Sequence, residues 1–172
     1  MFKKKDPLRK GFEILRDIRA LKDRIIRIQS RIDDRTEELS KKLVDLQIKG
    51  EKYLAVRYAE EIARLKDLSN RLSVVLLVLD KMDIAVQHAI VKNELNMLAS
   101  ELKDIMKEVS RLPETRLPDL NIIFADLESD VRELSEITLT SSLTYNPPSD
   151  SDIKAILNEA RETLKKSLEP AN

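Results

Sequence analysis

The chain has 172 residues and no net charge, and its composition excludes several classes of protein. Charged residues make up 36% and aromatic residues 3%, which is typical of elongated helices with thin apolar seams. Cysteine is absent, so disulfides and thiolate metal sites are excluded. The longest apolar run has six residues, far fewer than the ~20 that cross a bilayer, and no signal peptide follows the first lysines. We therefore expect an intracellular protein.

Charge is distributed unevenly along the chain. Residues 1–50 hold 15 Lys and Arg against 9 Asp and Glu, whereas residues 109–172 hold 7 against 12. This asymmetry predicts an anionic partner at the basic end, and it also allows the two ends to pair with each other.

The N-terminal segment is a candidate membrane-binding site. Two apolar residues precede three lysines, and two further cations follow, in the set Met1, Phe2, Lys3, Lys4, Lys5, Arg9 and Lys10. Each basic residue near an anionic membrane contributes ~1 kcal/mol, and a short apolar tip can enter the interface. The alternative is an exposed start of the chain that is merely rich in lysine.

The first long helix begins at Asp6-Pro7, with Asp as the cap and Pro in the first turn. Apolar residues then recur at steps of three and four as far as Leu46, which predicts an amphipathic helix of ~40 residues. Gly50 follows, and another strongly helical run begins directly after it. Gly50 therefore predicts a tight turn that folds the two helices into an antiparallel hairpin.

The stretch from Glu51 to Leu112 contains neither glycine nor proline and carries two apolar stripes. One stripe comprises Ile62, Leu65, Leu72, Val75, Leu79, Met82 and Val86 and suits packing on the first helix. The other is the candidate subunit interface and comprises Val74, Leu77, Ile84, Val91, Leu95, Leu98, Leu102 and Ile105. A helix with two stripes needs two partners, so either the C-terminal segments or other subunits cover the second.

The first stripe fades after Ile90, and only the second continues. We therefore predict a hinge at Lys92, Asn93 and Glu94, where the helix either runs straight or breaks.

The C-terminal third is divided by prolines. Pro113 and Pro118 end the long helix, and a shorter acidic helix is predicted over 119–137. Residues 138–150 are rich in Ser, Thr and Pro and predict a flexible linker before a last helix over 151–169. The predicted organisation is therefore all-α: a basic hairpin core over 1–109, a break and acidic helix over 110–137, the linker, and the C-terminal helix.

The sequence contains none of the residue patterns that are typical of catalytic sites. The single histidine, His88, lacks the neighbours of a di-iron site or a catalytic triad, and no glycine-rich phosphate loop is present. The basic helix lacks interleaved aromatic residues for stacking on bases. We expect no enzyme activity, no cofactor, no metal and no nucleic-acid partner.

This layout resembles the ESCRT-III family, most closely the archaeal cell-division CdvB type in a short form without the winged-helix extension. The resemblance rests on the basic first helix, the turn at Ile48-Lys49-Gly50, the opening Tyr53-Leu54-Ala55-Val56 with Ala59 and Ala63, the proline break and the acidic helix. It implies a cytoplasmic protein, peripheral on the inner face of the cell membrane at the division site. It also implies polymerisation with itself and with paralogous subunits, and a closed form held by the acidic tail.

The resemblance further implies docking of a AAA-type disassembly ATPase on the last helix. The candidate docking residues are Leu157, Arg161, Leu164 and Lys165, although Ala160 and Arg161 reverse the family's order and Lys154 replaces an acid. The alternative function is a soluble coiled-coil scaffold that binds partner helices through the second stripe and has no membrane activity.

Overall fold

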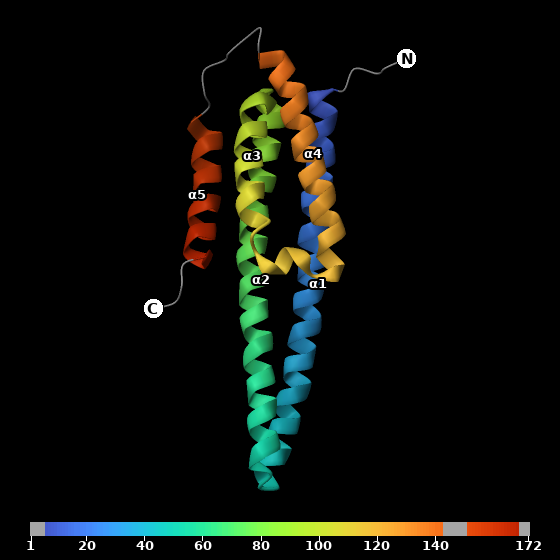
Figure 1. Ribbon diagram of the computed structural model, residues 1–172, viewed down its shortest axis with the longest axis vertical. Coiled ribbons are helices and arrows are strands. Elements are labelled where there is room, and N and C mark those ends of the chain that lie inside the picture. The colour runs from blue at the N-terminus through green and yellow to red at the C-terminus, as the bar shows by residue number, and fades with distance from the viewer. Residues whose placement is uncertain (1–5, 143–150, 169–172) are drawn as a thin grey trace.

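The computed structural model describes residues 6–142 and 151–168, and it confirms the predicted all-α fold with a long hairpin (Figure 1). Helix α1 spans Pro7–Ile48 and α2 spans Lys52–Lys92. The carboxylate of Asp6 accepts a hydrogen bond from the backbone N–H of Leu8 at 3.0 Å and so caps α1. Gly50 lies in the turn with φ of +74°, a conformation that other residues rarely adopt.

The first stripe of α2 packs on α1, as its spacing predicts. The residues of this stripe are buried except Leu65, which is half-buried, and those from Leu72 to Val86 share one apolar core with Ile14, Ile18, Leu21 and Ile25 of α1. Polar contacts align the pair: Lys22 Nζ lies 2.7 Å from Asp80 Oδ1, and Gln29 Nε2 donates to Ser73 Oγ at 2.8 Å. The hairpin is therefore joined by both apolar and polar contacts.

The second half of the long helical stretch turns back on the first. Helix α2 ends at Asn93, which has φ of 56° and ψ of 45°, and helix α3 (Leu95–Val109) then runs back beside the upper part of α2 (Figure 1). Asparagine is one of the few residues that adopt this left-handed conformation readily. The break lies within the predicted hinge at Lys92–Glu94, and the movement of that hinge stays a prediction.

The C-terminal helices complete a bundle around the open end of the hairpin. A short 3-10 helix, η1 (Pro113–Arg116), leads to α4 (Pro118–Ser142), which lies along α1. Helix α5 (Ser151–Leu168) lies on the other side, against α2 and α3 (Figure 1). The segments predicted as separate units thus share one apolar core, to which α1, α2, α3, α4 and α5 all contribute buried residues.

One boundary differs from the prediction. The acidic helix was expected to end at 137, with a linker over 138–150, but α4 continues to Ser142. The hydroxyl of Thr138 is buried and donates to the carbonyl of Leu134 at 2.9 Å, so its polar group is satisfied within the helix. Residues 143–150 of the predicted linker and residue 169 of the predicted last helix lie outside the described residues.

The closed end of the hairpin extends beyond the bundle (Figure 1). The residues there that are apolar and exposed are Val44, Ile48, Tyr53, Leu54 and Val56. Ala59 and Ala63 are exposed as well. Large side chains are packed most tightly at the open end.

Two leucines in α2 provide a matched test of this packing. Leu79 is 1% exposed, whereas Leu77 is 45% exposed. We expect Leu79→Ala to lower the free energy of unfolding by about 2–5 kcal/mol because it leaves a cavity, and Leu77→Ala to lower it by about 1 kcal/mol or less. Urea denaturation followed by circular dichroism measures both; equal losses would contradict the packing described here.

Candidate functional site

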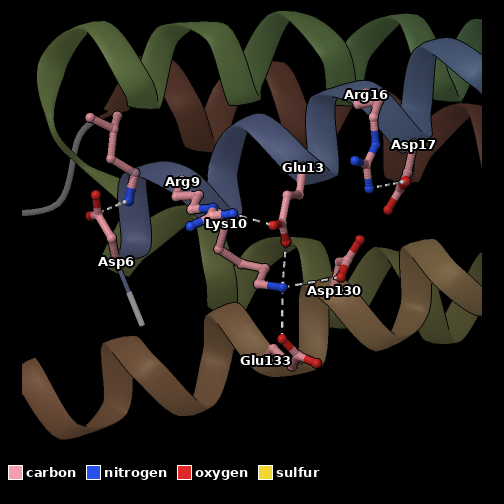
Figure 2. Close-up of polar contacts among 9 residues, drawn as sticks. Asp6, Arg9, Lys10, Glu13, Arg16, Asp17, Asp130 and Glu133 are labelled. Carbon is pink, nitrogen blue, oxygen red and sulfur yellow. Dashed lines mark hydrogen bonds and ion pairs between the residues drawn. The ribbon is translucent and has the colours of Figure 1, made fainter. Parts of the chain in front are cut away.

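A polar cluster joins α4 to α1 at the open end of the hairpin. We call it the clasp, and it consists of Lys10, Glu13 and Asp17 of α1 with Asp130 and Glu133 of α4 (Figure 2). The α1 members recur at steps of three and four, so they share one face of the helix. Asp130 and Glu133 share a face of α4 for the same reason. The clasp thus joins the basic N-terminal region to the acidic helix.

Lys10 is the central cation of the clasp. Its side chain is 12% exposed, and its Nζ lies 2.7 Å from Glu133 Oε2 and 3.2 Å from Asp130 Oδ1. Glu13, on its own helix, also contacts the ammonium (Figure 2). Burial opposes the charge, but the hydrogen bonds to Glu13, Glu133 and Asp130 outweigh it and raise the pKa of Lys10. Lys10 is therefore charged at every physiological pH.

Asp17 is the buried member of the clasp. Asp17 is 7% exposed, and its Oδ1 lies 3.6 Å from Nη2 of Arg16. The other carboxylate oxygen, Oδ2, is buried and has no hydrogen-bond partner among the described residues. Burial and the neighbouring carboxyl of Asp130 raise the pKa of Asp17 to about 7. Two carboxyl groups in such a position hold one proton more readily than either does alone.

Further ion pairs attach the ends of the C-terminal segments. Arg31 of α1 lies 3.5 Å from Asp119 at the start of α4, although both side chains are largely exposed. Glu114 of η1 is 5% exposed and lies 3.6 Å from Arg71 of α2. The pairing between basic and acidic ends that the charge distribution allows is thus present within the chain.

The last helix is held by both apolar and ionic contacts. Leu157 and Leu164 are fully buried. Arg161 Nη2 lies 2.8 Å from Glu101 Oε2 and 3.3 Å from Asp104 Oδ2 of α3, and Lys165 is exposed. Three of the four candidate ATPase-docking residues therefore contact the bundle in this structure.

The candidate subunit interface is divided between core and surface. Leu95, Leu98, Leu102 and Ile105 are buried within the bundle, at 3% exposure or less. In contrast, Leu77, Ile84 and Val91 of α2 are 45%, 48% and 84% exposed, and Val74 is half-buried. The C-terminal segments thus cover the α3 half of the stripe and leave much of the α2 half uncovered.

Only two of the predicted membrane-binding residues, Arg9 and Lys10, belong to the described part of the chain. Met1, Phe2, Lys3, Lys4 and Lys5 lie outside the described residues. Arg9 is exposed and pairs with Glu13 at 3.8 Å, whereas Lys10 is engaged by α4. In this structure Lys10 is therefore occupied by acidic residues of its own chain.

Sequence reasoning missed Asp17. A signal for it exists, because Asp17 follows Ile14 by three positions and precedes Leu21 by four, so it falls within the apolar stripe of α1.

Comparison with known proteins leaves the family open. No known family model matches the chain, and no solved structure matches it. Within residues 6–142 and 151–168, no group of His, Cys, Asp and Glu is placed to hold a metal ion. No helix in the same part of the chain is long and apolar enough to cross a membrane. The clasp and the uncovered face of α2 are therefore the candidate functional sites of this chain.

Lys10 and Arg9 provide a matched test of the clasp. We expect Lys10→Ala to lower the free energy of unfolding by on the order of 2 kcal/mol, because Glu13, Asp130 and Glu133 lose their shared cation. Arg9→Ala removes the same charge from a side chain that is 75% exposed, and we expect a loss below about 0.5 kcal/mol. Urea denaturation measures both. A similar small loss in the two variants would show that the clasp does not hold α4.

Proposed function

We propose that the protein is a non-enzymatic, ESCRT-III-like subunit of a membrane-remodelling filament that acts in cell division, membrane abscission or vesicle release. The observation that carries the proposal is the clasp, in which acidic α4 covers the basic end of a long helical hairpin. A closed subunit of this kind requires a detachable acidic segment on a basic, elongated core. Here the two are joined by a few ion pairs and one apolar face of α4.

The division of the second stripe supports the same proposal. Leu77, Ile84 and Val91 recur at seven-residue intervals on one face of α2 and are largely exposed. Such spacing is typical of a seam that packs against another helix. In the open form, Leu95, Leu98, Leu102 and Ile105 would extend this seam and meet neighbouring subunits, either identical or paralogous.

The break at Asn93 supplies a site for the change of form. The left-handed conformation of Asn93 costs about 1–2 kcal/mol relative to a helical one. This free energy is small, so new contacts of α3 with another subunit would be enough to shift the chain between the broken and the continuous helix. Realignment of α3 with α2 would merge the two into one rod and release α4 and α5. Release of α5 would also expose Leu157, Arg161 and Leu164 to a AAA-type ATPase.

Charge reversal in the clasp tests the closed form. Lys10→Glu, the clasp variant, replaces the central cation with a further carboxylate, so the acidic groups of α1 and α4 face one another; we expect α4 to detach and the fraction of protein that sediments as polymer to rise several-fold. Adding Asp130→Lys and Glu133→Lys restores opposite charges between α1 and α4 and should return the protein to its soluble form. Co-sedimentation with negative-stain microscopy measures both variants.

The control for this experiment is Arg9→Glu, which makes the same charge change at a neighbouring, exposed position of α1. We expect this variant to behave as the unmodified chain. Polymer formation in the control at the level of the clasp variant, or none in either, would count against closure through α4.

The N-terminal lysines test the membrane contact. We expect Lys3→Glu, Lys4→Glu and Lys5→Glu together to abolish binding to vesicles that contain anionic lipid, since each lysine contributes ~1 kcal/mol near such a surface. Flotation with anionic and with neutral vesicles measures the binding. Unchanged binding would move the contact elsewhere, and Arg24, Arg27 and Arg31 on α1 would be the next residues to test.

A second function is favoured by the exposed face of α2 alone. A soluble coiled-coil scaffold would use Leu77, Ile84 and Val91 to bind partner helices and would leave membranes untouched. It would form a discrete oligomer in light scattering, insensitive to anionic vesicles, and the clasp variant would form no filaments.

A further inference from the structure

The carboxyl groups of Asp17 and Asp130 meet in the seam between α1 and α4 (Figure 2). The charged groups that face Asp17 are Arg16 on its own helix and Asp126 and Asp130 on α4. Asp130 is also held by Lys10, whereas the carboxylate of Asp83 on α2 contacts Arg19 and Lys22 instead. Asp17 therefore faces two acids and one largely exposed arginine.

The seam has a different stability in the two protonation states of Asp17. When both carboxyl groups are ionised, two anions face each other and Asp17 Oδ2 remains buried with no hydrogen-bond donor among the residues that the structure describes. When Asp17 carries a proton, its O–H can donate to the carboxylate of Asp130, and the repulsion between the two groups is removed. The proton belongs on Asp17, because Lys10 Nζ lies 3.2 Å from Asp130 Oδ1 whereas Asp17 has only the largely exposed Arg16 beside it.

We propose that Asp17 and Asp130 form a proton-operated latch that holds α4 on α1 while they share a proton and weakens when the proton is lost. The proposal rests on the proposed function in treating α4 as a detachable segment, and it names a regulator of that detachment. It concerns the docking of α4 alone, so it is tested without filaments or membranes.

The direction of the pH effect follows from the two states of Asp17. In the docked form burial and Asp130 raise the pKa of Asp17 to about 7, whereas detachment exposes it to water and returns it toward its usual value. The docked form thus binds the proton more tightly. Docking is strongest in acid, weakens by up to about tenfold per pH unit as the pH rises toward 7, and levels off above that value.

Hydrogen exchange of the full chain measures the latch. We expect the protection factors of amides in α4, taken relative to those of buried residues in α2, to fall about tenfold between pH 6 and pH 8. In Asp17→Asn the side-chain amide donates to Asp130 at either pH, so protection of α4 should be equal at the two values. Asp23→Asn, on an exposed face of α1, is the matched control and should keep the full pH dependence.

A direct titration makes the test independent of the variants. Carbon-detected NMR of the aspartate carboxyl groups in the unmodified chain should give Asp17 a midpoint near neutrality. A midpoint near 4, or the same pH dependence of α4 protection in Asp17→Asn and the unmodified chain, would overturn the latch. If the latch is found but the clasp variant forms no filaments, the latch stands and the filament function fails.

Discussion

The chain reverses direction at Asn93, and this reversal brings α3 to the place where α4 and α5 pack on it. A helical stretch without glycine or proline turns back at one residue with φ of 56°, and this places α3 beside α2. The left-handed conformation costs about 1–2 kcal/mol, while burial of each large aliphatic side chain contributes about 1.5–3 kcal/mol. Leu95, Leu98 and Leu102 are all buried as a result, so the reversal is favourable as long as α4 and α5 cover them.

Local patterns in the sequence predicted most of the fold. The cap at Asp6, the turn at Gly50 and the first stripe of α2 depend on residues near one another in the chain, and the structure has each of them. The partner of the second stripe could not be predicted, because periodicity shows that a face needs cover but not what covers it. The predicted end of α4 is too early, because a run rich in Ser and Thr is typical of a linker, whereas the hydroxyl of Thr138 donates a hydrogen bond within its own helix.

The sequence predicts less of the candidate site than of the fold. The distribution of charge indicates a basic front and an acidic back and allows the two to pair, but it does not identify Glu133 and Asp130 as the contacts of Lys10. The burial of Asp17 is hard to predict because single acidic residues on helices are usually solvated. Its spacing from Ile14 places it in the seam, yet only the docking of α4 brings it against a second carboxyl group.

Both C-terminal helices depend on α3, and this couples their release. Helix α4 packs on α3 and α1, and helix α5 packs on α3 and α2. Arg161 of α5 is held by Glu101 and Asp104, both residues of α3. If α3 swung into line with α2, it would leave α4 with only its contacts to α1 and would break the ion pairs of α5 at the same time. Loosening of α4 and exposure of α5 are then two consequences of one rearrangement, because α3 cannot lie against α4 and α5 and in line with α2 at the same time.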